Sequence, residues 1–117
     1  MASLIDGEAL EAELSRRVRP ILPPSFARPT TGIVESLAES WCQDDDPVEA
    51  VAFLCGRYLD EVQDDVLFET HEKWPVLQSG GEASIFVEVA NGELRIGYAT
   101  RSERLDLGSI RPSQFLS

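Results

Sequence analysis

The dipeptide Asn91-Gly92 constrains the fold of this chain more than any other feature of its sequence. It separates two runs in which apolar and polar residues alternate, ASIFVEVA and ELRIGYA. This arrangement is the strongest short-range signal of a β-hairpin with a two-residue type I′ turn, and such a turn sets the register. The pairs this predicts are chemically compatible: Val89 with Leu94, Val87 with Ile96, Ile85 with Tyr98, Glu88 with Arg95, and Phe86 with Gly97. We expect a short third strand from Arg104 to Gly108.

Helical periodicity dominates the chain before the hairpin. A first helix is expected to begin at Ser3 or Asp6, both good N-cap residues, and to end near Pro20. Residues 20–29 contain four prolines and predict a stiff, extended connector rather than a domain boundary. A second helix is expected over residues 30–42, with Trp41 among the residues that face inward.

The third helix has the clearest start signal. Asp46-Pro47-Val48-Glu49 combines an N-cap carboxylate, a proline at the first helical position and a glutamate three residues after the cap. The helix is expected to reach about Glu72, and a break near Asp64 or Asp65 is an equal alternative. Its core-facing stripe comprises Val48, Val51, Ala52, Cys55, Tyr58, Leu59, Val62 and Val66.

These elements predict an α+β fold in which about three N-terminal helices precede an antiparallel three-stranded meander that packs on them. A chain of 117 residues has the size of a single domain, 1–117. The two cysteines, Cys42 and Cys55, are expected to be small buried hydrophobic residues. No apolar run has the length of a membrane span, and the N-terminus lacks the order of a signal peptide, so we expect a cytoplasmic protein.

The net charge of −11 is concentrated in one segment. Residues 35–72 contain twelve acidic side chains against Arg57, whereas residues 1–34 and 73–117 are each neutral in sum. Contacts to phosphate need a basic surface, so this distribution argues against nucleic-acid binding and against binding to anionic membranes. The charge instead favours a basic partner protein.

The acidic segment includes DEVQDDVLFETHE, residues 60–72. On a helix, Asp60, Glu61 and Asp64 lie opposite the apolar stripe, as they would on a solvated face. Phe53 falls among these acids in projection, one turn from Arg57. An aromatic residue within an acidic field is typical of protein interfaces, although Phe53 packing against another element is an alternative. The candidate partner-binding residues are Phe53, Arg57, Asp60, Glu61, Asp64 and Asp65.

A metal site is the competing interpretation of the same residues. Glu61 and Asp64 form an E-x-x-D pair, similar to the helical pairs that chelate magnesium in all-α nucleotide pyrophosphohydrolases. The second acidic pair that such a site requires is missing, because Glu35 and Glu39 have i,i+4 spacing. His71 has no second imidazole to complete a zinc site, and we expect it to be exposed at the helix end. We predict no cofactor.

The sequence as a whole predicts a non-enzymatic interaction domain that docks a basic partner through residues 35–72. In size and charge the chain is similar to small acidic immunity proteins, antitoxins and secretion chaperones. Nine arginines against one lysine indicate a bacterial, GC-rich source. One alternative is a magnesium-dependent nucleotide phosphohydrolase. The other is a structural homo-oligomer, such as a homodimer, whose subunits meet through Trp41 or the meander edge.

Overall fold

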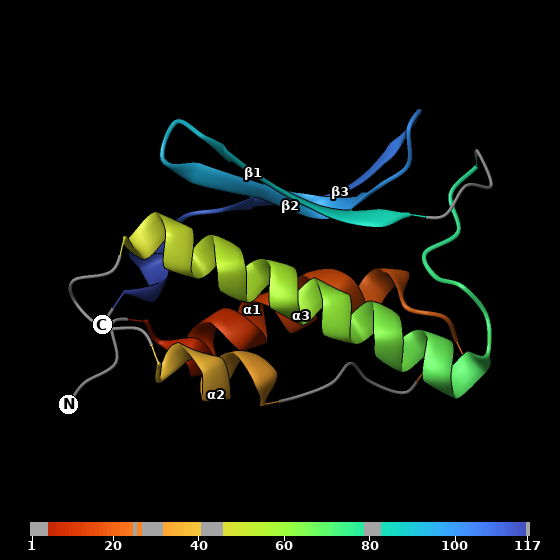
Figure 1. The fold of residues 1–117 in the computed structure, drawn as a ribbon, viewed down its shortest axis with the longest axis horizontal. Helices are drawn as coiled ribbons and strands as arrows, with labels where there is room; N and C mark the ends of the chain where they lie inside the picture. Colours follow the sequence, from red (N-terminus) through yellow and green to blue (C-terminus); the bar gives the residue numbers. More distant parts are fainter. Residues whose placement is uncertain (1–4, 25, 27–31, 41–45, 79–82, 117) are drawn as a thin grey trace.

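The computed structural model describes residues 5–24, 26, 32–40, 46–78 and 83–116. Three helices are followed by one antiparallel sheet in the order β1-β2-β3, which confirms the α+β prediction. The long helix α3 (Pro47–Thr70) lies between the sheet on one side and the helices α1 (Gly7–Val18) and α2 (Ile33–Ala38) on the other (Figure 1). In the described part of the chain, no helix combines the length and apolar character that a membrane span requires.

Helix α1 begins as its sequence predicts. The side chain of Asp6 accepts a hydrogen bond from the backbone N–H of Ala9, which satisfies one of the free donors of the first turn. The helix ends at Val18. Residues Arg19–Ile21 then form a short 3₁₀ turn that includes Pro20, so the connector starts as a turn and not as the extended segment we predicted. Proline fits the first turn of such a helix because the N–H that it lacks has no partner there.

Helix α2 is shorter than predicted, because it begins at Ile33 and ends at Ala38. The expected cap residues Thr30 and Thr31, and the inward-facing Trp41, lie outside the described residues. The cap comes from another element: the carboxylate of Glu11 on α1 accepts hydrogen bonds from the N–H groups of Gly32 and Val34, over 2.6 and 2.9 Å. This long-range contact joins the two helices where they start to pack.

Helix α3 is continuous over 24 residues, so the alternative break near Asp64 or Asp65 is absent. The carboxylate of Asp46 accepts hydrogen bonds from the N–H groups of Val48 and Glu49, as predicted for the N-cap. His71 closes the helix in a left-handed conformation, with φ of 59° and its N–H donating to the Leu67 carbonyl. The predicted helix-end histidine is exposed.

The hairpin has the predicted register over every pair. Strand β1 (Ser84–Ala90) and strand β2 (Glu93–Ala99) meet with Val87 opposite Ile96. Asn91 and Gly92 both have positive φ, as a type I′ turn requires. Strand β3 (Arg104–Ile110) is two residues longer than predicted and pairs with β2.

The outer face of the sheet carries its charged side chains and Phe86. A Cβ atom on Gly97 would lie 2.8 Å from the Phe86 ring and 2.1 Å from the Leu105 carbonyl oxygen, so the predicted pairing of aromatic with glycine is a steric requirement. Glu88 lies opposite Arg95 in register, but its ion pair is with Arg104 on β3.

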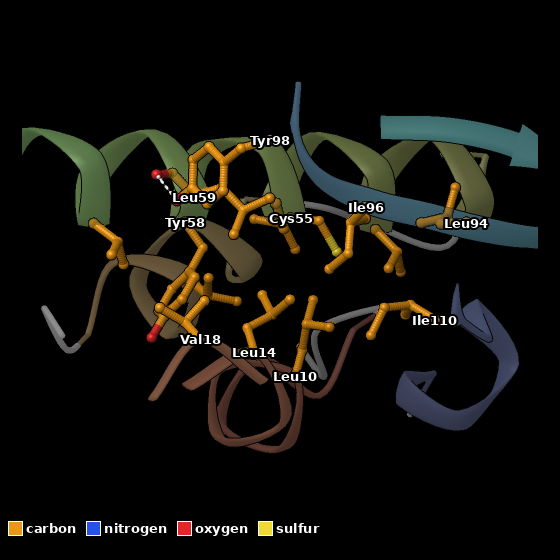
Figure 2. Close-up of a cluster of buried hydrophobic side chains, with 14 of the residues drawn as sticks. Leu10, Leu14, Val18, Cys55, Tyr58, Leu59, Leu94, Ile96, Tyr98 and Ile110 are labelled. Carbon is orange, nitrogen blue, oxygen red and sulfur yellow. Dashed lines mark hydrogen bonds between the residues drawn. The ribbon is translucent and has the colours of Figure 1, made fainter. Parts of the chain in front are cut away.

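The core lies where α3 meets the sheet and α1 (Figure 2). Cys55 is buried there, and burial raises the pKa of its thiol to about 12, so the thiol is a packing group and not a nucleophile. The position of Cys42 lies outside the described residues. Fully buried side chains come from each major layer: Leu10, Leu14 and Val18 on α1, Leu54, Tyr58, Leu59 and Val62 on α3, and Leu94, Ile96 and Tyr98 on β2.

Candidate docking surface

One face of α3 presents an aromatic side chain among acidic ones. Phe53 is 47% exposed. At 3.6 residues per turn, Asp60 and Asp64 each lie within about 20° of Phe53 around the helix axis, and Arg57 within about 40°. These four predicted site residues therefore share one face of α3.

The two remaining predicted residues lie to one side of this face. By the same geometry, Glu61 is about 80° and Asp65 about 120° from Phe53. Asp65 thus projects toward the side of α3 on which Tyr58 is buried, and its own side chain is partly buried. The structure does not place Asp65 beside Phe53.

Arg57 offsets part of the acidic charge. Its guanidinium Nη1 lies 3.5 Å from the Asp60 carboxylate Oδ2, and both side chains are more than 40% exposed. An ion pair this exposed contributes little to stability, because water and salt screen it. The side chain of Asp64 is exposed.

An open pocket of about 420 Å³ lies between α3, the start of β1 and the segment that follows α3. Trp74, Pro75 and Val76 form one wall, and Ala83, Ser84 and Ile85 form another. Asp60, Gln63, Asp64 and Leu67 supply the helix side, and Lys73 is the basic residue of the lining. Asp60 and Asp64 thus belong both to the Phe53 face and to this pocket.

A hydrogen bond holds two of the pocket walls together. The side-chain Nε2 of Gln63 donates to the backbone carbonyl oxygen of Ala83 over 2.8 Å, which ties α3 to the residue before β1. Trp74 is held from the other side, because its indole N–H donates to the Ile21 carbonyl over 3.1 Å. The walls of the pocket are therefore fixed by contacts far apart in sequence.

Exposed apolar side chains gather around this pocket. Val76 is 77% exposed and Leu67 is 46% exposed, and both line it. Phe68 is 81% exposed and, together with Asp64, Leu67 and His71, borders a shallow depression next to it. Surface patches of this kind, rimmed by polar groups, mark interaction sites.

Our sequence reasoning missed these apolar residues. The sequence could have indicated that Leu67 and Phe68 are exposed, since both fall outside the arc of the core-facing stripe that includes Val62 and Val66. No comparable signal marks Val76, which follows the helix in a segment without periodicity.

The residues proposed for magnesium do not converge on a metal site. Within the described ranges, no group of three or more histidine, cysteine, aspartate or glutamate side chains is arranged to hold a metal ion. Glu61 and Asp64 remain a pair on one helix, and Glu35 lies on α2, which packs on a different side of α3 from the sheet.

No protein-family model, curated protein or solved structure matches this chain.

Proposed function

We propose that this protein is a non-enzymatic binding domain whose α3 face docks a basic partner protein. The observation that supports this most is the half-exposed Phe53 on the same face as Asp60 and Asp64. Exposing an aromatic side chain of this size costs free energy that burial against another element of the fold would recover. A partner that covers Phe53 recovers it on binding.

The charges and the apolar groups have different roles in this proposal. The carboxylates attract a basic partner over a distance and raise the association rate. Phe53, with Leu67 further along the same face, contributes after encounter by excluding water from the contact and slowing dissociation. We further propose that this interaction takes place in the cytoplasm.

The test begins with recovery of partners from the source organism's lysate at about 50 mM and about 500 mM salt, and then measures kinetics with the purified partner. Over this range the Debye length falls from ~14 to ~4 Å, so the association rate should fall steeply. Changing Asp60 and Asp64 to asparagine should slow association, whereas Phe53→Ala should mainly raise the dissociation rate.

A matched control separates local from total charge. Glu8 on α1 and Glu35 on α2 are both exposed and lie away from the Phe53 face. Their replacement by glutamine removes the same number of charges and should slow association much less. Equal effects of the two double variants, or an association rate independent of salt, would contradict the proposed docking face.

A further inference from the structure

We propose that the partner binds as an extended segment that adds a strand to the outer edge of β1 and inserts an apolar side chain into the pocket beside Ile85. This inference rests on the proposed docking function and specifies how the partner is held. Strand addition supplies backbone hydrogen bonds, and a pocket for a side chain supplies selectivity.

The register identifies the backbone groups at that edge. In a hairpin with a two-residue turn, the pair next to the turn, Ala90 and Glu93, exchanges hydrogen bonds, and bonded pairs alternate along the strands. The N–H and C=O groups of Ile85, Val87 and Val89 therefore point away from β2. Among the strands that the structure describes, β1 lies at the edge of the sheet and β2 is its neighbour.

Strand β1 lacks the features that protect edge strands from pairing. Such strands are commonly blocked by proline, by lysine or by a β-bulge. The sequence SIFVEVA contains none of these residues, and the irregularity in the sheet falls between β2 and β3. Its charged side chain, Glu88, forms an ion pair with Arg104. The edge is thus a template for another strand.

The pocket lies in line with this edge. Successive strand residues point to opposite faces of a sheet, so a pocket lined by both Ser84 and Ile85 lies at the end or edge of β1 and not on one face. A segment paired along β1 passes the pocket. Its apolar walls, Leu67, Trp74 and Val76, then enclose an aliphatic or aromatic side chain of that segment.

The charge of the pocket lining and of the whole chain favours a basic segment. The lining contains Asp60 and Asp64 against Lys73, and the chain as a whole carries −11, so a segment with arginine or lysine beside its apolar residue is favoured. A second copy of this protein would bring its own Asp60 and Asp64 toward the same acidic face. A basic segment of another protein avoids that repulsion.

The probe is a synthetic extended peptide of about nine residues, matched to the length of β1, with a central leucine flanked by arginines and β-branched residues. Binding is followed through the backbone amide resonances of the ¹⁵N-labelled protein. Saturable shifts and slower amide exchange at Ile85, Val87 and Val89 are expected. The same peptide with glutamates in place of the arginines should bind at least about tenfold more weakly.

Two variants at one position separate backbone pairing from side-chain contact. Val89 is 60% exposed and its N–H points outward, so Val89→Pro removes an outward donor at an edge site where proline is tolerated. We expect it to weaken peptide binding at least about fivefold, and the control Val89→Ala to change it less than about twofold. The variant Val76→Lys, which places a cation at the exposed wall of the pocket, should weaken binding similarly.

The outcomes distinguish this inference from the docking function. If Val89→Pro and Val89→Ala bind the peptide equally, or if its shifts avoid β1, strand addition is wrong, and salt-dependent association with the partner still tests the docking face independently. If amides of β1 become protected with rising protein concentration and no peptide, a second copy is the occupant and the proposal is overturned. Peptide-induced protection lost in Val89→Pro supports it.

Discussion

The hydroxyl group of Tyr98 on β2 donates a hydrogen bond of 2.8 Å to the backbone carbonyl oxygen of Leu59 on α3 (Figure 2). Trp74 packs its ring against Tyr98 edge-on, with centroids 5.2 Å apart and planes at 71°. Tyr98 therefore joins the sheet, the long helix and the wall of the pocket. The candidate docking surface rests directly on this buried cluster.

Two tyrosine-to-phenylalanine substitutions should have different effects on stability. Tyr98→Phe removes a satisfied buried hydrogen bond and should lower the free energy of unfolding by about 1 kcal/mol. The Tyr58 hydroxyl is equally buried but has no hydrogen-bond partner among the described residues, so Tyr58→Phe should be neutral or stabilising. Denaturant unfolding of both variants measures the difference. A larger loss for Tyr58→Phe would contradict the assigned hydrogen bonds.

Alkaline pH should lower the free energy of unfolding of this protein. Burial raises the pKa of Cys55 and that of Tyr58 to about 12, and it also raises the pKa of Tyr98. In the unfolded chain these groups lose protons near their ordinary values of about 8.5 for cysteine and about 10 for tyrosine. The unfolded state then binds fewer protons than the folded state, so stability is complete below about pH 8.5 and falls as pH rises toward 12.

Chemical denaturation between about pH 8 and pH 11 measures this fall. Tyr58→Phe removes one of the three groups and should make the fall shallower. Stability that stays constant through pH 11 would show that the three groups titrate alike in both states.

Replacing Gly92 with valine should destabilise the protein by about 1–2 kcal/mol. Gly92 has φ of 76°, and no atom lies within 4 Å of where its Cβ would be, so the cost comes from backbone strain and not from a clash. The control Gly92→Asn should cost less, since asparagine tolerates the left-handed region. Thermal or denaturant unfolding compares the two, and equal losses would argue against the type I′ turn.

Magnesium should not stabilise this protein in a saturable way. A ligand that binds the native state raises the melting temperature, and the rise disappears when its ligands are removed. We expect millimolar magnesium to produce a general charge-screening effect, equal in the parent protein and in the Glu61→Ala/Asp64→Ala variant. A saturable shift lost in that variant would restore the phosphohydrolase interpretation.

Local signals explain which parts of the fold the sequence predicts. The hairpin register depends on two adjacent residues and an alternating pattern, and the start of α3 depends on Asp46 and Pro47; each involves neighbours in the chain. The start of α2 depends instead on Glu11, more than twenty residues earlier. Contacts at such a separation leave no periodic trace, and the helix bounds we predicted there were wrong.

The candidate surface likewise has features that local sequence predicts and features that depend on packing. Helical spacing alone places Asp60 and Asp64 on one face with Phe53, because that geometry is set by 3.6 residues per turn. Whether Phe53 is covered depends on which elements pack around α3, and spacing could not decide it. The pocket brings together α3, Trp74 and the start of β1, so no single segment predicts it.

The sequence by itself determined the order of helices and strands, the hairpin register and the concentration of the net charge of −11 in residues 35–72. Propensity, turn chemistry and charge are properties of neighbouring residues, so each of these features can be recognised in the sequence. Only the tertiary structure decided that α3 remains one helix, that Phe53 stays half exposed, and that a pocket opens between Asp64 and Ile85. These depend on packing between segments distant in the chain, where burial of apolar surface selects one arrangement.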